Sequence, residues 1–400
     1  MTFTFALIAN EQSSIRLKYW VLFSGGDARP MQLMVDKFNA SHKNINVEMK
    51  IIRWAEYYQT LNKNIHTKNT PDIAIIHASL LPWYVNKNAL SDLTPYTIQW
   101  QYISPTLLQA IQFNQKYYAL PLDMHPQVFY FNKKYLAHAN LLDQNSQPII
   151  GEGIDGFVEF MKKLQQTLPA DVLPFSTPNN NVLNWWIWYS LYSQQESKGY
   201  IVNNKAAINN TAGRKAFEFF YKMREANVWS QEIHDEKGYN LFKFNKAATM
   251  ITGVWTTWNF QQNKDLDFGV VEFPKIFNKR ANFGDSHTLV VLNSRDKVKQ
   301  KASAEFIQWM SENSFDWALS GQVPANTKVL TTKEFKNLPF RDVYVQSTNN
   351  MALYPKHLKL KECNDAMIKI LADFMKSHDS VEETMIKAEK TLNAILKKPE

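Results

Sequence analysis

Aromatic and acidic side chains stand at positions where predicted β-strands begin or end. Trp255 follows a strand-like run that closes with Gly253, and Trp54 follows another strand-like run that ends at Ile52. Asp123 lies shortly before a third such run. Flat rings offer an apolar surface and carboxylates accept hydrogen bonds. This combination suits a ligand that has C–H faces and a rim of hydroxyl groups, as a sugar ring has.

Further polar residues lie at or next to predicted strand ends and at the connections between strands. Together with the residues above, they form our set of candidate ligand-binding residues: Trp255, Asp123, Trp54, His125, Ser24, Gly25, His77, Ser79, Trp185, Asp285 and His287. Each has an alternative role, because a tryptophan in such a position can belong to the core. A polar side chain there can equally cap a helix or close a turn.

Trp185 belongs to a run of aromatic residues, 184–189, that reads Asn-Trp-Trp-Ile-Trp-Tyr. Consecutive residues of a helix point to different faces, so some of these rings must be core residues and at most one or two can face a ligand. We take Trp185 as the candidate for a ligand-facing ring.

The run 24–27, Ser-Gly-Gly-Asp, precedes a predicted helix. Backbone N–H groups at the start of a helix can hold a hydroxyl group or an anion, which places Ser24 and Gly25 in the candidate set. The run lacks the glycine order of a dinucleotide-binding loop, and the sequence has no Walker loop, His-Glu-x-x-His helix or Gly-x-Ser-x-Gly turn. The nine histidines include no close pair with metal-ligand spacing on one helix, so we predict no metal and no cofactor.

The segments that must position these residues alternate between strand and helix patterns. Strand-like runs at 15–21, 47–52 and 73–76 are each followed by a helical pattern. This alternation favours parallel strands in one sheet with helices on both faces, because a parallel crossover needs a helix-length connection. Ligands of such sheets bind at the carboxyl ends of the strands. Here those ends are the segments 23–27, 53–57 and 77–80.

A second cycle of strands and helices begins at 128–131 and returns with strands at 248–252 and 268–271. A strand at 288–292 and a helix at 301–313 follow it. The residues Ser380-Val381-Glu382-Glu383 form a capping-box pattern, which predicts a packed C-terminal helix with an apolar stripe that runs to Ile395.

The length and composition indicate a folded protein of two lobes. A chain of 400 residues exceeds the size that one hydrophobic core usually serves, and 45% of its residues are hydrophobic. The net charge of +8 comes from dispersed lysines without an arginine-rich arm, so we expect no nucleic-acid binding.

Cysteine content and hydropathy exclude two further classes. Cys363 is the only cysteine, so the chain can form neither an intramolecular disulfide nor a Cys-based zinc cluster. No run approaches the length of about 20 apolar residues that a membrane-spanning helix needs. The apolar tract 2–9 lacks a basic leader and is either the remnant of a secretory signal or a frayed terminus.

Four segments carry a family resemblance. They are 71–78 (Pro-Asp-Ile-Ala-Ile-Ile-His-Ala), 118–134 (from Tyr-Ala-Leu-Pro-Leu-Asp to Tyr-Phe-Asn-Lys-Lys), 247–255 (Ala-Ala-Thr-Met-Ile-Thr-Gly-Val-Trp) and 284–291 (Gly-Asp-Ser-His-Thr-Leu-Val-Val). In order and spacing, over about 300 residues, they resemble the extracellular solute-binding proteins of ABC importers. The similarity is to the sugar-binding family that includes maltose-binding protein. Phe131 stands where that family usually has the tyrosine of a Tyr-Asn-Lys crossing.

The resemblance implies an α/β, two-lobed periplasmic-binding-protein-like fold (type II) with mostly parallel sheets, discontinuous lobes and a hinge. Lobe one would comprise 15–128 and 288–315, and lobe two 129–287 and 316–400, with the ligand cleft between them. In the family, the tryptophan that corresponds to Trp255 stacks on sugar.

The implied function is that of a non-enzymatic, monomeric substrate-binding component. It would close on a mono- or oligosaccharide and deliver it to the membrane permease subunits of an ABC importer, in the periplasm or outside the cell.

Two other functions stay open at this point. The same fold could bind an anionic sugar phosphate or phosphodiester, because the chain is basic and the guanidinium groups of Arg29, Arg53 and Arg341 suit phosphate. A glycan-acting enzyme would instead need two carboxylates about 5 to 10 Å apart across a cleft. Asp123 and Asp285 are the candidates for such a pair.

Overall fold

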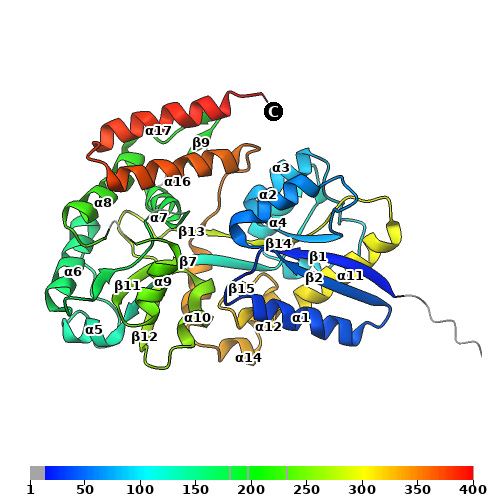
Figure 1. The fold of residues 1–400 in the computed structure, drawn as a ribbon, viewed down its shortest axis with the longest axis horizontal. Helices are drawn as coiled ribbons and strands as arrows, with labels where there is room; N and C mark the ends of the chain where they lie inside the picture. The colour runs from blue at the N-terminus through cyan, green and yellow to red at the C-terminus, as the bar shows by residue number, and fades with distance from the viewer. Residues whose placement is uncertain (1–13, 180–181, 196–197, 231–232, 400) are drawn as a thin grey trace, which may run out of the picture.

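The protein consists of two α/β bodies joined by strands that run between them (Figure 1). The computed structural model describes residues 14–179, 182–195, 198–230 and 233–399. The apolar tract 2–9 lies outside the described residues. The expected α/β fold class is therefore confirmed for the described part of the chain.

The first body carries the N-terminal half of the strand–helix alternation. Its elements are β1 (Ile15–Val21), α1 (Ala28–Ser41), β2 (Ile45–Ile51), α2 (Trp54–Asn64), β3 (Ile73–His77), η1 (Ala78–Leu80), α3 (Leu81–Asn86), η2 (Trp100–Tyr102), α4 (Pro105–Ile111), β4 (Gln112–Phe113), β5 (Lys116–Tyr117), β6 (Leu120–Pro121), β14 (His287–Val291), α11 (Lys297–Glu312) and α12 (Phe315–Ala318). Its five-stranded sheet has the order β2-β1-β3-β14-β6.

The second body holds the remaining elements. They are β7 (Asp123–Asn132), α5 (Lys133–His138), α6 (Gly153–Thr167), β8 (Leu173–Phe175), α7 (Val182–Ser193), β9 (Ile201–Val202), β10 (Lys205–Ala206), α8 (Thr211–Glu225), α9 (Asp235–Lys243), β11 (Ala247–Gly253), η3 (Val254–Thr256), α10 (Thr257–Gln261), β12 (Phe268–Glu272), β13 (Asn282–Asp285), β15 (Val323–Pro324), α13 (Thr327–Leu330), α14 (Lys333–Lys336), α15 (Arg341–Asn349), β16 (Met351–Ala352), α16 (Leu360–Lys376) and α17 (Val381–Leu396). Its sheet follows the order β16-β13-β7-β11-β8, and β12 and β15 also pair with β7.

Strand β7 connects the two bodies. It begins next to the first body and runs into the second, as Figure 1 shows in cyan. There it pairs antiparallel with β11, β12, β13 and β15. The strand directions are consequently mixed, and the expectation of mostly parallel sheets is corrected. Parallel pairs remain between β1 and its two neighbours, between β8 and β11, and between β13 and β16.

The predicted elements recur in the structure with small shifts of their ends. In α1, the apolar residues at positions i, i+3, i+4 and i+7, Met31, Met34, Val35 and Phe38, are all buried. At the start of α17, Ser380 and Glu383 form both hydrogen bonds of a capping box. Apolar spacing and capping chemistry therefore predicted these helices correctly.

Helix α7 lies inside the second body. Nearly all of its described side chains are buried, and a helix that is apolar on all sides needs neighbours on all sides. It contacts α8, α16 and β13. The aromatic run 184–189 belongs to this helix.

Candidate functional site

Three histidines meet at the junction between the two bodies. His77 ends β3, His125 lies near the start of β7, and His287 begins β14 directly opposite His77. One ring nitrogen of each lies within 4.8 Å of one ring nitrogen of both others. All three side chains are buried. The sequence predicted three separate candidates, and the structure brings them together in what we call the histidine cluster.

Asp123 is the hydrogen-bond centre of the histidine cluster. Its Oδ1 lies 3.0 Å from Nδ1 of His125 and accepts the backbone N–H of His287 at 3.0 Å. Its Oδ2 lies 2.7 Å from Nδ1 of His287 and from Nε1 of Trp317. The side chain is completely buried. These four partners occupy both oxygens, so a ligand hydroxyl would have to replace one of them, and the role of Asp123 in ligand binding stays a prediction.

The charge of Asp123 is stabilised by its neighbours. Burial opposes ionisation, but the attraction of His287 and the hydrogen bonds from His125 and His287 outweigh it, so the pKa of Asp123 lies well below its usual range. Burial lowers the pKa of His77 well below its ordinary value and lowers that of His287 as well. An ionised carboxylate only accepts hydrogen bonds, so both histidines facing it carry a proton on Nδ1.

Two partly exposed indoles flank the histidine cluster, one from each body. Trp54 opens α2 of the first body, is 43% exposed and packs edge-on against His77 with 5.3 Å between ring centroids. Trp255 lies in η3 of the second body, is partly exposed and packs edge-on against His125 at 5.9 Å. Both tryptophans were predicted as candidates, and the structure places both beside the same polar group.

Gly253 determines where the indole of Trp255 lies. A Cβ atom at residue 253 would stand 1.7 Å from Cζ3 of Trp255. The glycine therefore lets the indole fold back over the end of β11. The Gly-x-Trp spacing in the sequence has this steric origin.

Ser79 and Asp285 hold each other beside the histidine cluster. Ser79 donates from Oγ to Oδ2 of Asp285 at 2.5 Å and from its backbone N–H to Oδ1 at 3.3 Å. Burial raises the pKa of Asp285, although His125 and these hydrogen bonds oppose the shift. Both residues line a cavity of about 220 Å³ that Tyr354 and Lys356 also border. These two candidates are thus close to the cluster and to open space.

The loop that contains Ser24 and Gly25 is exposed and precedes α1. The backbone N–H of Gly25 donates to Oδ1 of Asp27 at 3.2 Å, so this group is used within the loop. Desolvation raises the pKa of Asp27 to about 6. A Cβ atom at Gly26 would lie 3.1 Å from Cδ1 of Trp258, so the loop of the first body touches α10 of the second.

Trp185 is a core residue, which corrects its prediction as a ligand-facing ring. It is completely buried and stacks on Trp188 with 5.2 Å between ring centroids, and its Nε1 donates to Asn364 at 3.0 Å. The neighbouring Trp186 is partly exposed and packs edge-on against Trp255 at 5.5 Å. The two rings face different neighbours because successive residues are turned around the helix axis.

Sequence reasoning missed three residues of this region. Tyr58 Oη lies 2.5 Å from Nδ1 of His77, and Trp317 binds Asp123. Trp186 was passed over for its neighbour Trp185, because both lie in the same apolar run. Tyr58 follows Trp54 at i+4, a spacing that places both on one helix face. No local signal pointed to Trp317.

Two of the three arginines named for the phosphate alternative bind other groups of the protein, whereas Arg29 is exposed. Arg341 is buried and donates to the backbone oxygens of Ala318 and Gly321 at 2.7 Å and 3.2 Å. Arg53 pairs with Glu56 at 2.5 Å. Asp123, one of the two carboxylates named for a glycan-acting enzyme, accepts four hydrogen bonds from the protein.

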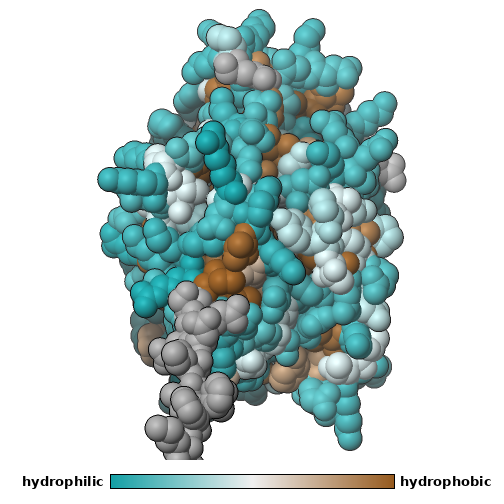
Figure 2. Space-filling model, turned by 90° about the vertical axis from the view of Figure 1, so that its right-hand side faces the viewer, coloured by the Kyte–Doolittle hydropathy of each residue, from teal (hydrophilic) through white to brown (hydrophobic). Residues whose placement is uncertain are grey.

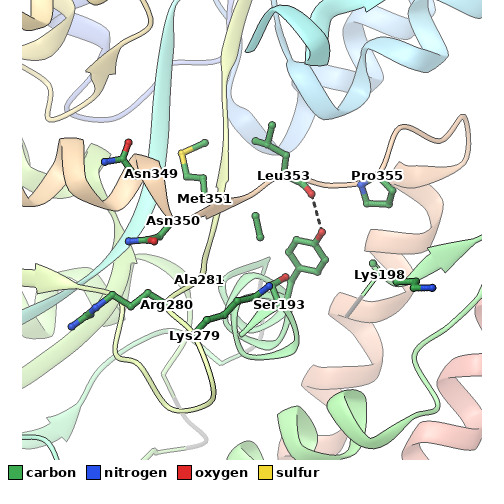
Figure 3. A pocket seen from close by; sticks show the side chains of 13 residues that line it. Ser193, Lys198, Lys279, Arg280, Ala281, Asn349, Asn350, Met351, Leu353 and Pro355 are labelled. Atoms are coloured by element: carbon green, nitrogen blue, oxygen red, sulfur yellow. Dashed lines mark hydrogen bonds between the residues drawn. The ribbon is translucent and has the colours of Figure 1, made fainter. Parts of the chain in front are cut away.

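A larger cavity of about 430 Å³ lies in the second body (Figure 3). Lys198, Lys279 and Arg280 contribute to its lining, and Tyr189 donates to the backbone oxygen of Leu353 at 2.8 Å across it. Its lining contains none of the candidate residues and no indole. We therefore place the candidate site at the histidine cluster.

The end face of the first body is mostly polar (Figure 2). Apolar groups appear there as small separate spots among hydrophilic side chains. Among the described residues, no helix is long and apolar enough to cross a membrane.

The chain is similar in sequence to a maltotriose-binding protein. The maltotriose-binding protein of Pyrococcus abyssi is 23% identical over 278 residues, which cover 65% of this chain and 55% of that protein. The chain thus spans about half the length of this curated relative.

Solved structures match the fold over nearly the whole chain. The GacH receptor of Streptomyces glaucescens, solved unliganded and with acarbose, superposes with a TM-score of 0.85 at 14% identity, covering 97% of this chain and 100% of that one. UgpB from Mycobacterium tuberculosis, in complex with glycerophosphocholine, gives a TM-score of 0.85 at 15% identity, covering 96% and 99%. These likenesses confirm the two-lobed fold.

The family model described as bacterial extracellular solute-binding protein matches residues 33–341. This match covers more than half of the chain and includes β3, β7, β11 and β14, the strands that carry the histidine cluster and lead to Trp255. The chain therefore belongs to the family of bacterial extracellular solute-binding proteins.

Proposed function

We propose that this protein captures a carbohydrate, a mono- or oligosaccharide, at the junction of its two bodies. The main support for this proposal is that Trp54 and Trp255, which belong to different bodies, flank the histidine cluster. Indoles can stack on the C–H faces of a sugar, and imidazole nitrogens and hydroxyl groups can bind its rim. Partial exposure of both indoles leaves them accessible to such a ligand.

The two bodies would act as lobes that close on the ligand. Our proposed division places 15–128 and 288–315 in lobe one, and 129–287 and 316–400 in lobe two. Trp317 and Ala325 pack in the core of the first body. This packing favours a boundary at which the chain crosses into lobe two after α12, slightly later than residue 315. Closure requires that the ligand bind the closed form more tightly than the open form, since equal affinity for both would leave the equilibrium between them unchanged.

The relatives support this ligand class. The Pyrococcus abyssi relative is named for maltotriose, and the GacH receptor was solved with acarbose. Both are carbohydrates or carbohydrate analogues. The glycerophosphocholine in UgpB marks the contrasting class, an anionic phosphodiester.

Delivery to the permease subunits of an ABC importer completes the proposal. The chain would work as a non-enzymatic monomer in the periplasm or outside the cell, as its family membership suggests. It would bind no nucleic acid, because its lysines are dispersed.

Isothermal titration calorimetry with a panel of neutral sugars, maltotriose included, tests the proposal. We expect one member of the panel to bind with a stoichiometry of one and to change the tryptophan fluorescence. Binding of glycerophosphocholine or a sugar phosphate, with every neutral sugar inactive, would reassign the ligand class.

A further inference from the structure

We propose that His77, His125 and His287 form a binding site for one divalent transition-metal ion, with zinc as the reference ion, at the junction of the two bodies. The three imidazoles would leave one coordination position open. This inference goes beyond carbohydrate binding and does not depend on it.

The three rings are close enough to share an ion. Their ring centroids lie 4.3 Å (His125 to His287), 4.7 Å (His77 to His287) and 5.4 Å (His77 to His125) apart. One nitrogen from each lies within 4.8 Å of the other two. Zinc–nitrogen bonds of about 2.0–2.1 Å at tetrahedral angles need nitrogens about 3.3 Å apart. Binding one ion would therefore require side-chain rotations that bring these nitrogens closer together.

Outer partners orient the three rings as in known metal sites. The two oxygens of Asp123 engage Nδ1 of His125 and Nδ1 of His287, and Tyr58 Oη engages Nδ1 of His77. Metal-bound histidines almost always donate their second ring nitrogen to a carboxylate or another oxygen, which fixes the tautomer and strengthens the ligand. The phenol oxygen of Tyr58 accepts the backbone N–H of His77 at 3.1 Å, and its second lone pair can accept the proton on Nδ1 as well.

The remaining nitrogen of each ring is available. Within the described part of the chain, Nε2 of His77, His125 and His287 has no hydrogen-bond partner. A neutral imidazole with its proton on Nδ1 carries a lone pair on Nε2, which is the form that binds a metal. Asp123 fixes this form for His125 and His287, and His77 adopts it when Tyr58 Oη accepts its Nδ1–H.

The backbone holds the ligands firmly. His77 and His287 are opposite each other in the pair of β3 and β14, and His125 pairs with Asp285 in the pair of β7 and β13. Sites on strands are more exact than sites on loops. Three imidazoles with an open fourth position are typical of zinc, and imidazole also suits copper, nickel and iron.

Metal titration of the chelator-treated protein in the absence of carbohydrate tests the proposal. We expect one equivalent of Zn²⁺ to bind, measured by competition with a chromophoric chelator, and Co²⁺ to give the visible absorption of a four- or five-coordinate ion. The thermal midpoint of the protein should rise with Zn²⁺ concentration, because an ion that binds only the folded state stabilises it. Failure of the folded wild-type protein to bind Zn²⁺ or Co²⁺ stoichiometrically would overturn the site.

Two variants separate this site from adventitious surface binding. His125→Asn and His287→Asn retain a nitrogen near the Nδ1 position for the bond to Asp123 but remove Nε2. Each should weaken Zn²⁺ binding by about 100-fold or more, since loss of an outer partner alone costs about 10–100-fold. His378→Asn, at an exposed position in the turn before α17, is the matched control and should bind as the wild type does.

Circular dichroism without metal checks that each variant is folded. Unchanged Zn²⁺ affinity in both folded cluster variants would show that the ion binds elsewhere and would overturn the proposal. If the two variants do not fold, the wild-type stoichiometry and the Co²⁺ spectrum decide alone. Because no carbohydrate is present, neither result bears on the proposed sugar binding.

Discussion

Nδ1 of His287 lies 2.7 Å from Oδ2 of Asp123, although 164 residues separate the two in the chain. The same carboxylate binds His125 and Trp317. These residues belong to β7, to β14 and to α12, which flank the places where the chain passes between the bodies. Asp123 therefore ties together the connections on which any movement of the bodies depends.

Asp123→Asn should destabilise the fold. The amide would lose the charge and would direct an N–H group at a hydrogen-bond donor of His287, His125 or Trp317. Loss of charged, buried hydrogen bonds predicts a decrease in the free energy of unfolding of about 3 kcal/mol. Urea denaturation followed by circular dichroism measures it. Asp171→Asn, which removes a surface ion pair with Lys246, is the control and should leave the midpoint unchanged.

Trp255→Ala should weaken carbohydrate binding by about 10-fold to 100-fold, because the indole would no longer cover a sugar face. Calorimetric titration with the sugar that binds the wild type measures the loss. Trp309→Phe is the control, since Trp309 is partly exposed and packs against Phe38 and His42 at the far end of α1. Equal affinities for Trp255→Ala and the wild type would remove the main support for the proposed site.

Gly253→Ala should act through Trp255. A Cβ atom at residue 253 would lie 1.7 Å from the indole, so the ring must move away from its position. We expect a loss of affinity similar to that of Trp255→Ala, with the far-UV circular dichroism of the wild type. The double variant should bind no more weakly than Trp255→Ala alone. Additive losses would mean that the glycine acts in another way.

The adjacent residues Trp185 and Trp186 should respond differently. Trp185→Ala leaves a cavity beside Trp188, Tyr200 and Tyr354, which predicts a decrease in the free energy of unfolding of about 3–5 kcal/mol. Trp186→Ala should cost less stability, because that ring is partly exposed, and should reduce carbohydrate affinity through its contact with Trp255. Chemical denaturation and calorimetry of both variants distinguish the two roles.

Asp27 should make the stability depend on pH. Desolvation raises its pKa from 3.8 to about 6. A raised pKa of an acid favours the folded state fully below pH 3.8, and this contribution is lost as the pH rises through 6. Asp27→Asn should therefore be more stable than the wild type at pH 8, with the difference shrinking toward pH 4. Asp36→Asn, on the exposed face of α1, is the matched control for the loss of one carboxylate.

The order of strands and helices could be predicted from the sequence because apolar spacing and capping pairs act over a few residues. The strand at 15–21 and the capping box at Ser380 are examples. The antiparallel pairing of β7 could not, since it depends on segments that lie more than a hundred residues away. Strand direction needs that long-range information.

The site shows the same limit. His77, His125 and His287 were each predicted from their place near a strand end, but their meeting depends on the register of β3 with β14. Our expectation considered histidine pairs on a single helix, whereas these three histidines lie on three strands, β3, β7 and β14. The sequence did not distinguish Trp185 from Trp186. The helix is apolar on nearly all sides, so its sequence does not show which side faces the ligand.

The saturation of Asp123 has a consequence for how this protein can change over generations. A substitution there must be matched at His125, His287 and Trp317 at once, whereas Trp54 and Trp255 each depend on few neighbours. Ligand specificity can therefore change through single substitutions at Trp54 or Trp255, while Asp123 and its hydrogen-bond partners stay the same.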